Sequence, residues 1–154
     1  MSGLIVTATT TKIAITSSST FRLLQVAAPS NQRVKVLRWG VFFDEETGDA
    51  TPATPLVVNA GKQTASTGGS TLTAVRITPG SETLQSTCLH TLTTSTLLTV
   101  DSSIVNPQTG FEIIYPMGQE VVLAGGEKFG IEVTSGATIS TGGLNAIAKI
   151  WYEE

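Results

Sequence analysis

Short apolar runs separated by turn residues dominate the hydrophobic pattern of the chain, most clearly in its last third, Phe111–Glu154. The runs there are divided by Pro-Met-Gly, Ala-Gly-Gly, Ser-Gly and Thr-Gly-Gly, which are typical of turns between strands. Apolar and polar positions alternate over Lys128–Thr134, which predicts a strand with one buried face and one solvated face that carries Glu132. The final run, Leu144–Tyr152, is apolar on both faces, so we expect a closing strand near the centre of a sheet.

Strands are also expected upstream of this block. Phe21–Ala28 and Gln32–Asp44 are two apolar runs joined at Pro29-Ser30-Asn31, a turn signal, and together they predict a hairpin. Within the second run the alternation changes phase, which predicts a β-bulge near Val36 or Leu37. The remaining expected strands are shorter and richer in threonine: Leu56–Asn59, Thr71–Thr78, Ser86–Thr93 and Ser95–Asp101.

The spacing of these runs predicts the fold class. From Phe21 onward there are about eight to ten short strands, roughly 8–12 residues apart, and no window has helical periodicity with capping residues. We therefore expect an all-β, antiparallel β-sandwich of the jelly-roll type. An immunoglobulin-like sandwich ranks second because the Cys…Trp…Cys spacing is absent. One domain is expected over residues 21–154, after residues 1–20 that form either edge strands or an extended arm pairing with another chain.

The composition supports this fold and argues against nucleic acid and membrane partners. The 154 residues include 25 threonines and 14 serines, and the β-branched threonine suits a half-exposed sheet surface. With 14% charged residues and a formal net charge of −3, the chain lacks the basic surface of nucleic-acid binders. The single cysteine cannot form an intramolecular disulfide, so the fold does not depend on an oxidising compartment. There is no signal-peptide pattern and no apolar run of about 18 residues, so neither export nor a membrane partner is expected.

Few residue groups point to chemistry. Cys88 and His90 fall at i and i+2, but a nucleophilic pair also needs contact and an orienting group, so a buried thiol and a structural histidine are the favoured interpretation. Asp44–Asp49 places four carboxylates in one loop without the calcium-loop pattern, which favours a solvated loop over a cation site. A single histidine nearly excludes a cupin-type metal site. We therefore expect no enzyme activity, no cofactor, no metal and no small-molecule substrate.

Three segments resemble a known protein family: RLLQVAAPSNQRVKVLRWGVFFD (Arg22–Asp44), FEIIYPMGQEVVLAGGEKFGIEVTS (Phe111–Ser135) and AKIWYEE (Ala148–Glu154). Together they are similar to the capsid decoration, or cement, proteins encoded among the head genes of tailed bacteriophages, which have a jelly-roll-like fold. The middle of the chain, Glu45–Gly110, resembles no part of that family.

The resemblance implies a viral structural protein that assembles in the host cytoplasm. It would form a homotrimer, bind the major capsid protein on the outside of the mature head, and so reside on the virion. The alternative is a trimeric jelly-roll binding module, like tumour necrosis factor, that recognises a carbohydrate or a receptor. Apolar and aromatic side chains are enriched at protein interfaces as well as in cores. The candidate partner-binding residues are therefore Leu4, Val6, Ile13, Ile15, Trp39, Phe42, Trp151 and Tyr152.

Overall fold

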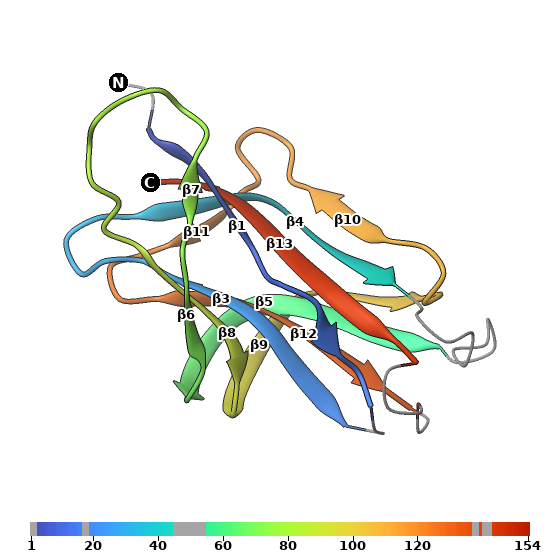
Figure 1. Cartoon of the computed structure of the whole chain (residues 1–154). Helices are drawn as coiled ribbons and strands as arrows, with labels where there is room; N and C mark the ends of the chain where they lie inside the picture. The colour runs from blue at the N-terminus through green and yellow to red at the C-terminus, as the bar shows by residue number, and fades with distance from the viewer. Residues whose placement is uncertain (1–2, 17–18, 45–54, 137–138, 140–142) are drawn as a thin grey trace.

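Two antiparallel sheets pack face to face in the computed structural model, which describes residues 3–16, 19–44, 55–136, 139 and 143–154 (Figure 1). The all-β sandwich predicted from the sequence is confirmed. Thirteen strands lie in the described residues, more than the eight to ten expected, because four of them have only two or three residues. They are β1 (Ile5–Thr9), β2 (Ile13–Ala14), β3 (Thr20–Ala27), β4 (Val34–Asp44), β5 (Leu56–Thr67), β6 (Ser70–Leu72), β7 (Val75–Arg76), β8 (Thr87–Leu92), β9 (Thr94–Val105), β10 (Phe111–Ile114), β11 (Val121–Leu123), β12 (Lys128–Ser135) and β13 (Asn145–Glu153).

The larger sheet has seven strands in the order β10-β4-β13-β1-β7, with β11 also paired to β4 and β2 also paired to β13. The smaller sheet has six strands in the order β6-β8-β3-β12-β5-β9. The chain crosses repeatedly between the two sheets, which gives the jelly-roll-like connectivity (Figure 1). As the sequence predicts, the closing strand β13 lies inside its sheet, paired with β4 on one side and β1 on the other.

The inner faces of the two sheets form one hydrophobic core. Val6, Ile150 and Tyr152 point inward from the larger sheet, and Phe129 and Ile131 from the smaller one, and none of them has exposed surface. Full burial of a valine, isoleucine or phenylalanine side chain contributes roughly 1.5–3 kcal/mol. The predicted buried face of β12 therefore supplies much of the attraction between the sheets.

A partly buried hydrogen-bonded group of three side chains ties the sheets together near one edge. The indole Nε1 of Trp39 on β4 donates to Asp101 Oδ2 on β9 at 3.2 Å, and also lies 3.1 Å from the Tyr115 hydroxyl. Tyr115 in turn donates its hydroxyl to Asp101. Burial, followed by the hydrogen bond to Asp101, raises the pKa of Tyr115 well above its ordinary value, so Tyr115 stays a neutral donor.

Strand β4 confirms one prediction and overturns another. The register between β13 and β4 shifts so that Trp151 lies opposite Arg38 and Tyr152 opposite Val36, which places the predicted bulge at Leu37. The predicted hairpin of β3 and β4 is wrong: β3 pairs with β12 and β8 in the smaller sheet, whereas β4 belongs to the larger one. The turn between the two strands carries the chain from one layer to the other.

Residues 5–14 belong to the larger sheet of their own chain. β1 pairs along its length with β13 and, on its other side, with β7. β2 pairs with Asn145 and Ala146 at the start of β13. The described part of residues 1–20 therefore pairs within its own chain, and β1 has a neighbour on both sides and does not lie at the edge of the sheet. Residues 1–2 and 17–18 lie outside the described residues.

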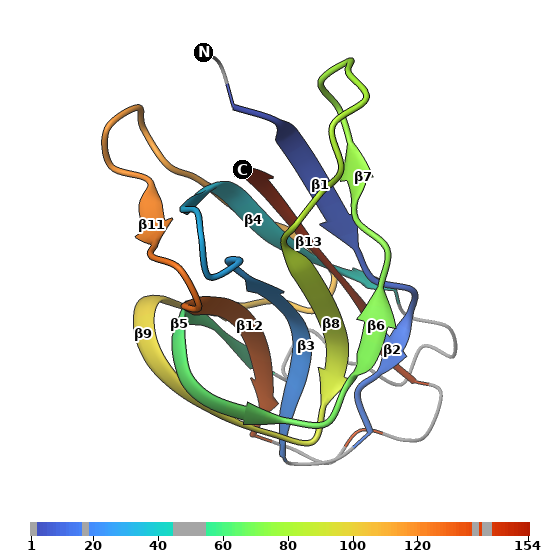
Figure 2. The same cartoon turned by 90° about the vertical axis from the view of Figure 1, so that its left-hand side faces the viewer.

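β5 and β9 form a long two-stranded ribbon that bends across the outer side of the smaller sheet. Figure 2 shows both strands curling beneath β12 and β3. The bend contains two register shifts, one between Ala60 and Gly61 and one between Gln63 and Ala65. At Gly61 the two backbones come so close that a Cβ atom would lie 2.1 Å from the Leu98 carbonyl oxygen. Only glycine leaves room for this approach.

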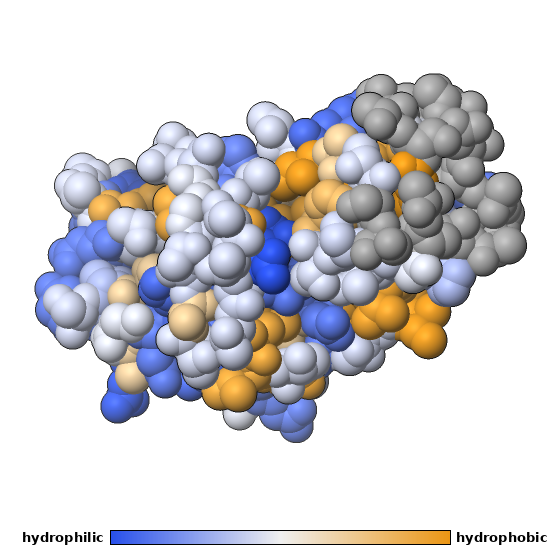
Figure 3. Space-filling view, turned by 90° about the horizontal axis from the view of Figure 1, so that it is seen from below, coloured by the Kyte–Doolittle hydropathy of each residue, from blue (hydrophilic) through white to orange (hydrophobic). Residues whose placement is uncertain are grey.

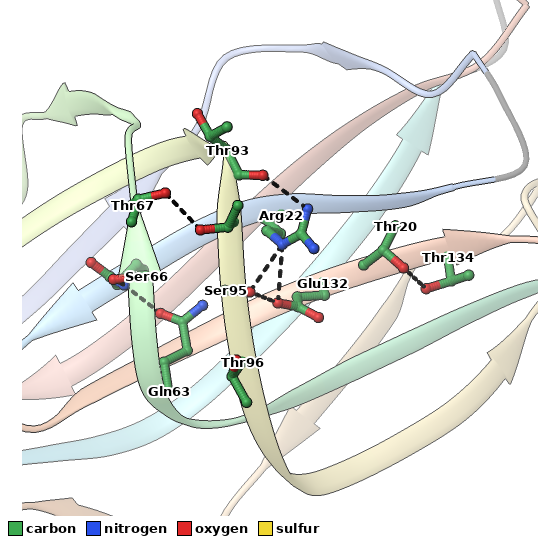
Figure 4. A network of polar contacts seen from close by, with 12 residues as sticks. Thr20, Arg22, Gln63, Ser66, Thr67, Thr93, Ser95, Thr96, Glu132 and Thr134 are labelled. Atoms are coloured by element: carbon green, nitrogen blue, oxygen red, sulfur yellow. Dashed lines mark hydrogen bonds and ion pairs between the residues drawn. The ribbon is translucent and has the colours of Figure 1, made fainter.

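The ribbon buries Glu132, which corrects the prediction that this residue faces solvent. Glu132 is 8% exposed because Ser95, on the ribbon, lies over it and donates its hydroxyl to the carboxylate (Figure 4). Arg22 Nε donates to Ser95 Oγ at 3.1 Å and lies 3.8 Å from Glu132 Oε1. Burial raises the pKa of Glu132, and the Arg22 charge opposes this rise. Alternation in one strand carries no information about a ribbon that folds back from elsewhere in the sequence.

A second polar group lies beside this one under the ribbon. Gln25 Nε2 donates to Gln63 Oε1 and, at 2.9 Å, to Ser66 Oγ. Lys128 Nζ donates to the same Ser66 oxygen at 2.9 Å. Gln25 and Gln63 are both buried, and these hydrogen bonds replace part of the water that the amides lose, whereas Gln63 Nε2 has no hydrogen-bond partner among the described residues. The ribbon is thus fastened to the sheet by polar contacts.

The close approach at Gly61 predicts a sensitive position. We expect Gly61→Ala to lower the free energy of unfolding by about 2 kcal/mol or more, since the new methyl group would meet a backbone carbonyl that cannot rotate away. Gly136→Ala is the matched control, because no atom lies within 4 Å of a Cβ there. Its effect should stay within about 0.5 kcal/mol. Equal urea midpoints for the two variants would contradict the described bend.

Burial of Glu132 predicts a pH-dependent stability. Because the folded-state pKa of Glu132 is raised, the protonated side chain favours the folded state, and this contribution is lost as the pH rises through the folded pKa. Glu132→Gln removes the buried charge and keeps an oxygen that Ser95 can donate to. We expect this variant to be more stable than the wild type at pH 7, on the order of 1 kcal/mol.

The difference should shrink as the pH falls toward about 4, where the wild-type carboxyl is also neutral. Thermal unfolding of both proteins from pH 4 to pH 8 measures this directly. A gap that widens toward low pH would show that the attraction between Arg22 and Glu132 outweighs the burial of the carboxylate.

Candidate functional site

The outward side of the larger sheet gathers most of the exposed apolar side chains. Ten large apolar residues are exposed in the described part of the chain. Six of them lie on this side, each 39% to 64% exposed: Ile5, Phe42, Val75, Ile77, Ile114 and Val122. We call this surface, together with Trp151 on the middle strand, the apolar face. Exposed apolar groups of this kind mark protein contacts.

The strand register determines which residues share this face, because residues directly opposite each other point to the same side of a sheet. On β13, Trp151 alternates with the buried Ile150 and Tyr152, so it points outward. Across the sheet Trp151 lies opposite Arg38 and Thr7. Thr7 lies opposite Val75 of β7, and Arg38 lies opposite Ile114 of β10. The apolar face therefore runs across all five strands of the main sheet order.

The outer side of the smaller sheet differs because the ribbon covers its centre. Figure 3 looks from below onto this side, where most residues are hydrophilic or intermediate and the apolar ones form small separate groups. The ribbon leaves three apolar side chains of β9 exposed, Leu98, Val100 and Ile104. Beneath the ribbon lie the polar contacts of Arg22, Gln25 and Glu132. Only the larger sheet therefore presents a broad outward side that no other strand covers, within the described residues.

Trp151 forms the centre of the apolar face beneath two cations. The Arg38 guanidinium carbon lies 3.5 Å from the centroid of the Trp151 ring, and Lys149 Nζ lies 4.2 Å from it. Each such contact at a partly exposed site contributes about 0.5–1 kcal/mol. With these two side chains over its ring, Trp151 is only 8% exposed. Trp151 is therefore held in place by its own chain.

The charges of the apolar face are only partly paired. Arg38 lies 3.7 Å from Glu112, and Lys35 lies 3.4 Å from Glu153, each measured between the nearest nitrogen and oxygen atoms. Asp44, at the end of β4, forms an ion pair with Lys12. Lys149 has no carboxylate partner among the described residues; its contact is the Trp151 ring. The face thus carries one cation whose charge no neighbouring acid balances.

Of the eight residues predicted to bind a partner, the structure brings two onto this face. Phe42 and Trp151 lie on neighbouring strands, and Phe42 is 40% exposed. The other six pack into or against the hydrophobic core, which accounts for them without a partner: Leu4, Val6, Ile13, Ile15, Trp39 and Tyr152. The aromatic positions predicted from the sequence therefore divide between the core and the apolar face according to strand register.

Five residues of the apolar face were missed by sequence reasoning: Ile5, Val75, Ile77, Ile114 and Val122. Each lies in or directly after a short strand and alternates with polar or buried neighbours, as core-facing residues do. Their outward direction follows from pairing with strands that are distant in the sequence, as Val75 of β7 pairs with Thr7 of β1 and Val122 of β11 with Lys35 of β4. No local pattern distinguishes them from core residues.

Two cavities offer no reactive pair. One of about 220 Å³ is lined by charged residues near the chain ends, including Lys35 and Glu153, which pair with each other. The other, of about 390 Å³, is lined by Thr71, Leu72, Thr73, Ala74, Thr83, Leu84, Ser86, Thr87 and Cys88. Burial raises the pKa of the Cys88 thiol to about 11, so the sulfur is protonated at neutral pH and is a poor nucleophile.

The residues that the sequence analysis considered for catalysis or metal binding do not form a site among the described residues. Cys88 Sγ lies 3.7 Å from the Tyr152 hydroxyl, whereas His90 Nδ1 contacts Thr91 Oγ1 at 3.0 Å. In the described ranges no cluster of three or more His, Cys, Asp or Glu residues is placed to hold a metal ion. Residues 45–49 of the acidic loop lie outside those ranges. The same part of the chain contains no helix with the length and apolar character needed to cross a bilayer.

Comparison with known proteins does not identify a family for this chain. No protein-family model matches the chain, and no curated protein matches it either. The function therefore has to be argued from the apolar face and from the resemblance of the three sequence segments.

Proposed function

We propose that this protein is a capsid decoration protein of a tailed bacteriophage. It binds the major capsid protein on the outside of the mature head as a homotrimer, after assembly in the host cytoplasm, and stabilises the head. The observation that carries the proposal is the apolar face: six exposed large apolar side chains spread over one uncovered sheet side. A surface of this kind suits a protein that functions by attachment.

The three segments that resemble decoration proteins lie next to one another in space, which supports the proposal. Arg22–Asp44 provides most of β3 and all of β4, Phe111–Ser135 provides β10 to β12, and Ala148–Glu154 provides most of β13. β4 pairs with β10, β11 and β13, and β3 pairs with β12. The resemblance therefore covers the centres of both sheets and four of the strands that carry the apolar face, β4, β10, β11 and β13.

The middle of the chain, which resembles nothing in that family, lies mainly around this scaffold. It provides the ribbon strands β5 and β9 and the strands β6, β7 and β8. β6, β7 and β9 are the outermost strands in their sheets. Peripheral strands and loops vary more readily than a packed centre, so a resemblance confined mainly to the packed centre is compatible with a family relationship.

The proposed mechanism is thermodynamic and needs no reactive group. A protein that binds the expanded lattice and not its precursor stabilises the expanded form by mass action. Joining three copies in one trimer raises the overall affinity by roughly 10²–10⁴ without any new contact, provided that all three reach the lattice together. The low charge and the Thr-rich sheet surface of this chain are compatible with such a role.

Binding to purified phage heads tests the proposal. We expect the wild-type protein to have the mass of a trimer, to co-sediment with expanded heads and not with unexpanded ones, and to raise the temperature at which the heads break open. Ile114→Ser, on the apolar face, should weaken binding about tenfold. Ile104→Ser is the matched control, since Ile104 is exposed on β9 outside that face, and it should bind as the wild type does.

Both substitutions replace exposed side chains, so the stability of the monomer should change by no more than about 0.5 kcal/mol. A monomeric wild-type protein that stays in the supernatant with expanded heads would refute the proposal. Binding on a glycan array, without binding to heads, would instead favour the trimeric carbohydrate-binding module.

A further inference from the structure

The apolar face carries outward-facing cations although the whole protein is acidic. Lys35 lies 3.4 Å from Glu153 and Arg38 lies 3.7 Å from Glu112, whereas Lys149 has no carboxylate partner among the described residues. The whole chain has a formal net charge of −3. The unpaired charge of Lys149 favours a partner that brings a negative charge and disfavours one that brings another cation to the same place.

We propose that the apolar face docks on an acidic patch of another protein, with a partner carboxylate placed beside Lys149 and Arg38 above Trp151. In the proposed function, on which this inference rests, that partner is the major capsid protein. The proposal identifies the chemistry of the partner surface: apolar at its margins and acidic at its centre.

Because Lys149 has no carboxylate partner among the described residues, a protein docked on this face has to supply one. Docking a partner over the apolar side chains removes water from Lys149, and a desolvated ammonium group without an acid is strongly unfavourable. Within the chain its contact is the Trp151 ring at 4.2 Å, and no carboxylate of the described residues reaches it. Arg38 already shares its charge with Glu112 at 3.7 Å. The partner must therefore bring the acid.

The arrangement around Trp151 also has the features of an interface hot spot. Tryptophan and arginine are enriched among residues that dominate binding energy, and they lie centrally within a ring of contacts that exclude water. Here Trp151 and Arg38 lie on the two middle strands, and Ile5 and Ile114 lie on strands to either side. The apolar side chains would exclude water, and the central cations would determine the register of the partner.

A second copy of the same face is a poor occupant. An interface between identical surfaces has a two-fold axis, and residues near that axis meet their own counterparts in the other copy. If the axis passed through the centre of the face, Lys149 and Arg38 of one copy would approach the same cations of the other, and opposed like charges disfavour such a contact. This leaves trimer contacts to other surfaces of the molecule.

Charge reversal at Lys149 tests the inference on expanded heads. We expect Lys149→Glu to weaken binding by about tenfold or more, and wild-type binding to weaken as salt rises from low to high ionic strength. Lys62→Glu is the matched control: it makes the same charge change at a lysine that pairs with Glu127 on the smaller sheet, away from the apolar face. It should keep wild-type affinity. Lys149→Arg should also retain binding, because the positive charge remains.

The outcomes separate this inference from the proposed function. Wild-type binding to heads that Lys149→Glu leaves unchanged would overturn the acidic partner patch while the decoration role stands. No wild-type binding to heads would overturn the decoration role, and with it the partner named here. A change in oligomeric mass for Lys149→Glu, measured by light scattering, would show that a second copy occupies the face.

Discussion

The bend of the β5–β9 ribbon is the constraint on which the rest of the structure depends. The two backbones can bend together because Gly61 has no side chain where the Leu98 carbonyl approaches. Once bent, the ribbon covers the outer side of the smaller sheet and brings Ser95 and Ser66 onto polar side chains of β3 and β12. The smaller sheet is thus covered on both faces, and the larger sheet remains the one with an open side in the described residues. The position of the apolar face follows from this asymmetry.

The two covered surfaces are held by different physical interactions. Between the sheets, side chains such as Phe129 and Ile131 lose all contact with water, and the attraction is hydrophobic. Beneath the ribbon, amides, hydroxyls and the Glu132 carboxylate exchange water for one another, a replacement with a small net free energy per bond. The ribbon is therefore the less strongly attached layer, and the core determines the stability of the sandwich.

Sequence patterns predicted those features that depend on neighbours along the chain. The phase change around Val36 and Leu37 predicted the bulge, and the two-sided apolar run predicted that β13 lies inside its sheet. The patterns could not predict where β3 and β4 pair, because a turn looks the same whether it joins two strands of one sheet or crosses between layers. Nor could they predict that Glu132 is buried, since this depends on the ribbon folding over β12, or that Val75 faces outward, since this depends on pairing with β1. Of the residues on the apolar face, only Phe42 and Trp151 were predicted from the sequence.

The position of Cys88 makes the reactivity of its thiol a measure of how often the edge of the sandwich opens. The thiol lies next to the Tyr152 hydroxyl and lines a cavity together with the segment that joins β6 to β7. Cys88 is the single cysteine in the sequence. Cys88 is 2% exposed and its pKa is raised, so a reagent that modifies thiols reacts with the closed form slowly and with an opened edge much faster. The rate of modification therefore reports how often that edge opens, with no added label. If attachment to a partner holds the larger sheet in place, the same sulfur would record it as a slower reaction.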